Sequence, residues 1–142
     1  MGDSFRNLTV WQRAIDLTLT IYKLTSSLPE SERFGLTNQL RRASVSVASN
    51  IAEGYGRASR GEYLQHLGIA RGSISELETQ LVIVKALGFG SEHELSTAED
   101  LCNEVGRILR AMMKSLKSKS LVPSPQTLFK NPNGYAIFAQ IR

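Results

Sequence analysis

The sequence predicts an all-α protein, an up-and-down antiparallel four-helix bundle with an irregular C-terminal tail. Three observations predict this fold. Apolar residues recur in steps of three and four over most of residues 9–118, the spacing that places side chains on one helix face. Glycine, proline and capping residues divide that stretch into four segments. With 142 residues, 42% of them hydrophobic, the chain is long enough for one soluble domain with its own core.

The first helix is expected over residues 9–28, where Pro29 stops it. Two apolar lines follow this segment on different faces, one through Trp11 and Ile15 and the other through Ile21. A helix that is apolar on two faces is central in its fold or buried in an oligomer. This segment therefore gives a first indication of self-association.

The second helix is expected over residues 36–53, where the apolar positions keep helical steps. Residues 44–47 alternate with period two and also fit a strand. Helix is favoured because no other segment offers such a strand a partner. Gly54 and Gly56 are expected to end this helix by adopting positive φ angles.

The third and fourth helices are expected over residues 59–87 and 92–118, joined by a short turn at Gly88. Each begins with a capping-box pair, Ser59 with Glu62 and Ser91 with Glu94. At 1.5 Å per residue, both helices are about 40 Å long. They form an antiparallel hairpin with coiled-coil-like seams.

The bundle is assigned to residues 1–119 and the tail to residues 120–142. The tail holds three of the four prolines and a set of apolar side chains between residues 128 and 141. Such a segment is too apolar to be inert. We expect it to dock within the protein's own assembly.

The search for catalytic or metal-binding motifs gives negative results. His66 and His93 lie 27 positions apart, and Cys102 is the single cysteine, so no zinc-ligand spacing exists. Residues 54–56 resemble part of a dinucleotide loop, but no strand precedes them. Cys102 occupies a seam position and is expected in the core. We therefore expect no catalytic residues, no metal, no cofactor and no enzymatic activity.

The charge is unevenly distributed along the chain, with a net value of +4. Residues 1–60 hold eight basic and five acidic side chains, residues 61–100 two and seven, and residues 101–142 seven and one. This pattern suits internal pairing or an anionic partner. A lone cysteine and the lack of an apolar signal or spanning segment predict a cytoplasmic protein that does not enter membranes.

A stripe of basic residues on the fourth helix is the main candidate binding feature. It consists of Arg107, Arg110, Lys114 and Lys117. Their spacing places them on one face, away from the apolar seam, so they form either a solvated face or a surface for RNA or DNA phosphates.

Two further arginine pairs lie earlier in the chain. Arg57 and Arg60 flank the loop after Gly56 and are candidates to grip a phosphate. Arg41 and Arg42 lie within the second helix, and we expect them to pair with acidic residues rather than with phosphate. Their expected partners are Glu53, Glu76 and Glu78.

Several runs of the sequence resemble a known family. They are FRNLTVWQ at residues 5–12, GLTNQLRRA at 35–43, SNIAEGYGR at 49–57 and ELETQL at 76–81. In this order they resemble the small bacterial four-helix-bundle proteins encoded in 23S rRNA intervening sequences. The resemblance covers residues 5 to about 117 and implies an up-and-down bundle that assembles as a homopentamer. It also implies kinship with accessory proteins of diversity-generating retroelements, which bind nucleic acid and a reverse transcriptase.

Two functional hypotheses follow. The first is a non-enzymatic, oligomeric RNA-binding protein that acts through its basic patches, with DNA as a less favoured ligand. The alternative is a protein-interaction adaptor, such as an accessory subunit of a reverse transcriptase. Salt separates them, because phosphate binding weakens steeply with ionic strength and an apolar interface does not.

Overall fold

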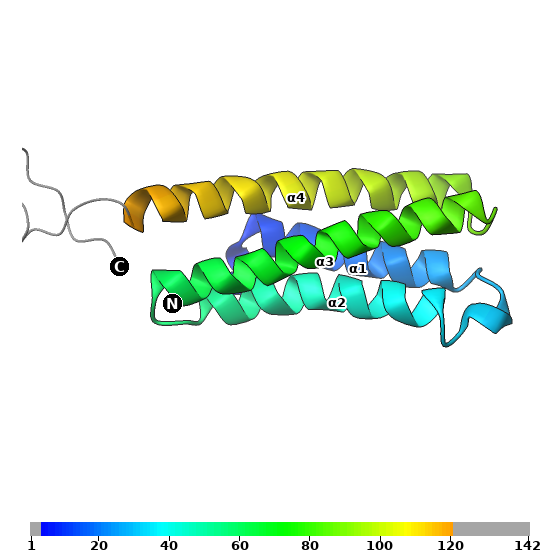
Figure 1. Ribbon diagram of the computed structural model, residues 1–142, viewed down its shortest axis with the longest axis horizontal. Coiled ribbons are helices and arrows are strands. Elements are labelled where there is room, and N and C mark those ends of the chain that lie inside the picture. Colours follow the sequence, from blue (N-terminus) through cyan, green and yellow to red (C-terminus); the bar gives the residue numbers. More distant parts are fainter. Residues whose placement is uncertain (1–3, 121–142) are drawn as a thin grey trace, which may run out of the picture.

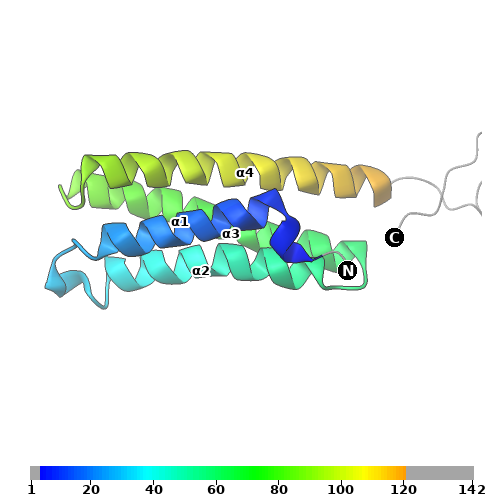
Figure 2. The ribbon, with the colours of Figure 1, turned by 180° about the vertical axis from the view of Figure 1, so that it is seen from behind.

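The computed structural model describes residues 4–120 of the chain. This range forms the helices α1 (Thr9–Thr25), α2 (Leu36–Tyr55), α3 (Arg60–Ala86) and α4 (Glu92–Ser120), with short 3-10 turns at Phe5–Asn7 and Glu30–Glu32. Successive helices run antiparallel (Figures 1 and 2). Each helix packs on its neighbours in the chain, and α4 packs back on α1. The predicted up-and-down four-helix bundle is confirmed.

Helix α1 ends at Thr25, three residues before the predicted end at Leu28. The hydroxyl of Thr25 donates to the Ile21 carbonyl, and the next two serines also bond to carbonyls of the last turn. Leu28 stays in the core at 8% exposure. It precedes Pro29, whose ring disfavours a helical conformation in the preceding residue.

Helix α2 includes residues 44–47, so the helix prediction for this segment is confirmed over the strand alternative. The predicted role of its glycines is wrong, because the positive φ angles among residues 4–120 occur at Gly88 and Gly90. Gly54 lies inside α2 and is buried. A Cβ there would lie 2.8 Å from the Cβ of His66. This glycine is therefore required by the close approach of α3 rather than by a turn.

The starts of α3 and α4 follow the predicted capping pattern. The Ser59 hydroxyl accepts from the Glu62 backbone N–H at 3.1 Å, and the Ser91 hydroxyl accepts from the Glu94 N–H at 3.2 Å. Gly88 and Gly90, with φ angles of 77° and 76°, form the turn between the two helices. Both positions require the left-handed region that glycine adopts without strain.

The core runs the length of the bundle and takes residues from all four helices. Its largest fully buried side chains include Leu17, Ile21, Leu40, Ile51, Leu67, Leu77, Leu81 and Leu109. The apolar line of α1 that runs through Trp11 and Ile15 is only partly buried, since these two side chains pack at the edge of this core. They line a shallow groove against Val45 and Ala48 of α2 with a volume of about 250 Å³.

The predicted division at residue 119 lies at the end of the described range, where α4 extends to Ser120. The expected docking of the tail concerns residues 121–142, which lie outside the residues that the structure describes. No helix within residues 4–120 is long and apolar enough to cross a membrane.

Candidate nucleic-acid interface

The four basic residues predicted on α4 form an exposed face of that helix. Arg107, Arg110, Lys114 and Lys117 are all exposed, and we call this set the basic face. Within residues 4–120, Arg107, Arg110 and Lys114 have no acidic partner. The basic face lies in the second half of α4, where the helix dipole favours positive charge.

Arg110 lies beside the groove between α4 and α3. Its Nη1 atom is 3.4 Å from the position that a Cβ would take at Gly106, so the side chain folds back along α4. The same Cβ position is 3.5 Å from a methyl of Ile74 on α3. The absence of a side chain at Gly106 thus leaves room for both the guanidinium and the α3 contact.

Arg71 of α3 extends this cationic surface and is not among the basic residues predicted as a site from the sequence. Gly106 faces Ile74 and Gly68 faces Met113, so the antiparallel pairing places Arg71 level with residues 109 and 110 of α4. Arg71 is exposed. The sequence contained one signal for this position. Arg71 lies three residues after Gly68, and residues three apart share a helix face, so Arg71 lies on the side of α3 that faces α4.

The opposite flank of α4 is acidic and faces α1. Glu104 binds Arg13 of α1 at 2.9 Å, and Arg13 also contacts Asp16 at 2.8 Å. The Glu104 carboxylate, followed by that of Asp16, raises the pKa of Arg13. Asp100 lies nearby, because it lines a shallow pocket between α1 and α4 together with Arg13, Asp16 and Glu104. Asp100 and Glu104 therefore lie on a different flank of α4 from the basic face, and Arg107, Arg110 and Lys114 form no ion pair with an acidic residue of their own helix.

The predicted Arg57–Arg60 pair lies at the turn between α2 and α3, at the end of the bundle where α4 terminates (Figure 1). Arg57 forms an ion pair with Glu53 at 2.9 Å, one helical turn earlier. Arg60 is the first residue of α3 and is partly exposed. The structure therefore does not present two equivalent cations here, because Glu53 neutralises one of them.

The predicted carboxylate partners of Arg41 are wrong. Its Nε atom donates to the Thr25 hydroxyl at 2.8 Å, and its guanidinium lies 4.4 Å from the centre of the Tyr22 ring. Arg41 faces α1 rather than α3, which separates it from Glu76 and Glu78. Arg42 does line a pocket with Glu76, but the two form no ion pair.

A row of hydrogen-bonded polar side chains runs along the contact between α2 and α3. The Ser73 hydroxyl donates to that of Ser46 at 2.9 Å, and the Asn50 amide donates to the Ser46 carbonyl at 2.9 Å. His66 Nδ1 lies 3.0 Å from Asn50 Oδ1 and 3.9 Å from a Glu53 carboxylate oxygen. These contacts give His66 a structural role in the interface between α2 and α3.

Cys102 is in the core, as predicted, with no exposed surface. Burial, reinforced by the nearby carboxylates of Glu78 and Glu99, raises the pKa of its thiol to about 12. The thiolate is the nucleophilic form of cysteine, so both the burial and the raised pKa of Cys102 disfavour its reaction at neutral pH. No cluster of three metal-ligating side chains occurs within residues 4–120.

Fold and surface together define a four-helix-bundle protein with one exposed cationic helix face. The family model of the 23S rRNA-intervening sequence protein matches residues 6–111, about three-quarters of the chain. The protein belongs to this family, which confirms the resemblance seen in the sequence. Its link to retroelement accessory proteins stays a prediction.

A solved structure shows the same fold. It is a protein of unknown function from the S23 ribosomal protein family of Bacteroides thetaiotaomicron. The two superpose with a TM-score of 0.69 at 21% sequence identity, and the match covers 75% of this chain and 99% of the other. A search of curated proteins found no match.

Proposed function

We propose that this protein binds structured RNA without catalysing a reaction, through the basic face of α4. The observation that carries the proposal is the basic face itself, in which Arg107, Arg110 and Lys114 are exposed and lack acidic partners within residues 4–120. Basic side chains that neutralise phosphates release counterions, which favours binding. The 23S rRNA named in the family's description supports RNA, rather than DNA, as the preferred ligand.

The expected mode of recognition is shape and charge rather than base sequence along most of the RNA. RNA helices are recognised largely through phosphates and 2′-hydroxyls. Residues 4–120 contain no strand, so they offer no sheet platform on which bases could stack. Arg71 adds a fifth cation to the same region, at the level of Arg110.

Self-association would strengthen this binding. The groove between α1 and α2 exposes apolar side chains, among them Val45 at 43% exposure. We propose a second copy of the chain as its occupant, in the homopentamer that the family resemblance implies. Several basic faces on one assembly would then make weak phosphate contacts additive.

The test is fluorescence-polarisation binding to a hairpin fragment of 23S rRNA across a salt series. The variant carries Arg107→Gln, Arg110→Gln, Lys114→Gln and Lys117→Gln. A matched control carries four changes of exposed basic residues on other elements, Arg6→Gln, Lys23→Gln, Arg33→Gln and Lys85→Gln. Both lose four charges, and light scattering compares their assembly with that of the wild type.

The basic-face variant should lose most of its affinity. The slope of log affinity against log salt is negative, and its magnitude should decrease by roughly three in this variant, because each of the four lost phosphate contacts contributes about 0.7 to 0.9. The control should keep most of the affinity and slope. Equal binding by both variants would contradict the proposal. It would favour the adaptor hypothesis, in which the apolar groove of α1 and α2 meets a protein partner.

A further inference from the structure

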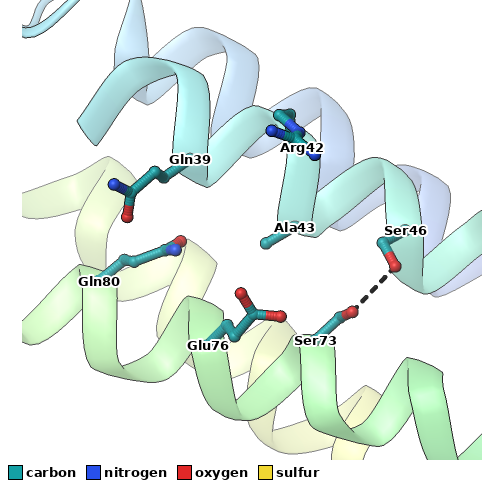
Figure 3. A pocket seen from close by; sticks show the side chains of 7 residues that line it. All are labelled: Gln39, Arg42, Ala43, Ser46, Ser73, Glu76 and Gln80. Atoms are coloured by element: carbon teal, nitrogen blue, oxygen red, sulfur yellow. Dashed lines mark hydrogen bonds between the residues drawn. The ribbon is translucent and has the colours of Figure 1, made fainter. Parts of the chain in front are cut away.

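A pocket of about 310 Å³ lies between α2 and α3, away from the basic face. Figure 3 shows its walls: Gln39, Arg42, Ala43 and Ser46 come from α2, and Ser73, Glu76 and Gln80 from α3. The Ser46–Ser73 hydrogen bond closes one end. The volume is at the lower end of small-molecule sites and suits a ligand with a single ring system.

Gln80 is the unusual residue of this pocket. Its side chain extends from α3 toward α2 (Figure 3) and is only 7% exposed. Its Oε1 atom is buried and has no hydrogen-bond partner. Buried polar atoms are nearly always paired, because an unpaired one loses its bonds to water without compensation. The pocket therefore contains an acceptor whose donor is missing.

The two charged residues of the pocket are also unpaired with one another. Arg42 and Glu76 are exposed at its rim, and neither forms an ion pair within residues 4–120. The α3 wall thus presents acceptors, the Glu76 carboxylate and the Gln80 oxygen. The α2 wall presents the donors of the Arg42 guanidinium.

We propose that this pocket holds a guanine base turned out of the RNA that the basic face binds, so the inference rests on the proposed function. Guanine carries two adjacent donors, N1–H and the N2 amine, which suit the Glu76 carboxylate and the Gln80 oxygen. Its O6 and N7 atoms are the acceptors that arginine binds in a bidentate manner. Adenine, cytosine and uracil lack this pairing of two neighbouring donors with two acceptors.

The position of the pocket agrees with an RNA strand held on α4. Ser73 lines the pocket, whereas the next residue, Ile74, lies under Gly106 beside Arg110. The pocket and the basic face therefore occupy the two flanks of α3 at the same level. Single-stranded loops and bulges of RNA present bases that can be splayed out in this way.

The first experiment titrates the isotope-labelled protein with guanosine 5′-monophosphate and follows side-chain amide signals by NMR. The Gln80 amide should shift, and adenosine, cytidine and uridine monophosphates should leave it in place. Inosine 5′-monophosphate lacks the N2 amine. Its affinity should be lower than that of the guanine nucleotide by between about five- and 150-fold, the range for one good base contact.

Two variants assign the effect to the pocket. Glu76→Gln should weaken guanine binding, because the amide replaces one acceptor with a donor. The control Glu78→Gln removes the same charge from the same helix, on the flank that faces Cys102 of α4. It should bind guanosine monophosphate as the wild type does.

The outcomes separate this inference from the proposed function. Equal shifts with all four nucleotides, or no shift of Gln80 with any, overturn the guanine pocket even if the rRNA hairpin binds with a steep salt slope. A guanine-specific shift in a protein that fails to bind the hairpin overturns the RNA function while the pocket's ligand stands. A guanine-specific shift that Glu76→Gln does not weaken also contradicts the assigned contacts.

Discussion

The two flanks of α3 are held to the bundle by different forces. Toward α2 the contact contains a row of hydrogen-bonded side chains. The row consists of Ser46, Asn50, His66 and Ser73. Toward α4 the contact is apolar, and Cys102, like the leucine at position 109, is fully buried. Apolar burial supplies most of the stability of a fold, whereas a hydrogen bond adds little net free energy. The difference indicates that apolar burial holds the α4 flank, whereas the α2 flank adds directional polar contacts beside the pocket that contains Gln80.

The largest expected effect is on the apolar flank. Leu109→Ala should lower the free energy of unfolding by about 2–5 kcal/mol, through lost burial and the cavity left behind. The matched control is Leu19→Ala on α1, whose side chain is 64% exposed. It should change stability by less than about 0.5 kcal/mol. Urea unfolding followed by circular dichroism measures both, and equal losses would contradict the comparison.

A smaller effect is expected where α2 and α3 approach most closely. In Gly54→Ala the new Cβ would lie 2.8 Å from the Cβ of His66 and 3.1 Å from a Tyr63 ring carbon, so the helices must separate. The expected loss is about 1–3 kcal/mol, typical of overpacking. Gly72→Ala is the control, because nothing lies within 4 Å of its Cβ position.

That control should raise stability by about 0.5–1 kcal/mol, since alanine is the better helix former. If Gly54→Ala were equally stabilising in thermal unfolding, the close approach of α3 would not constrain this position.

The effect that is smallest near neutral pH, and that grows only in alkaline solution, reports how well water is excluded from the contact between α3 and α4. Burial raises the pKa of Cys102 from 9.0 to about 12. The folded state therefore holds the thiol proton more tightly than the unfolded chain does. Below pH 9 this leaves stability unchanged, and between pH 9 and about 12 the free energy of unfolding should fall by up to about 1.4 kcal/mol per pH unit.

Cys102→Ala removes the thiol, so the difference between the two pH profiles isolates this contribution. A thiol reagent at pH 8 should label the native protein far more slowly than the urea-unfolded chain. Rapid labelling of the native protein would show that water reaches this side of the bundle.

The helices were predictable from the sequence because their apolar spacing and caps act locally. The start of α3 at Ser59 and the basic face of α4 follow directly from residues three or four apart. The early end of α1 was not predicted, because it depends on three hydroxyls that bond to the last carbonyls. In such cases local hydrogen bonding competes with the apolar pattern.

The contacts between helices were less predictable. Arg41 was assigned to carboxylates but contacts Tyr22, because periodicity does not specify which neighbour a helix face meets. Gly54 was assigned to a turn, although its small size serves helix packing. The pocket was missed for the same reason. Gln80 is a polar residue that is buried beside Leu81. It was the one signal in the sequence for a pocket between α2 and α3.

The hydroxyl pair between α2 and α3 also fixes how far the two helices can slide along one another. A shift of one turn, about 5.4 Å, would place Ser46 opposite Ile69 or Leu77 instead of Ser73. Apolar side chains tolerate such a shift more easily than a hydroxyl does, because they need no directional partner. The Ser46–Ser73 bond therefore favours the native register of the two helices. The repeating apolar pattern alone would also permit registers shifted by one turn, in which this hydrogen bond is lost.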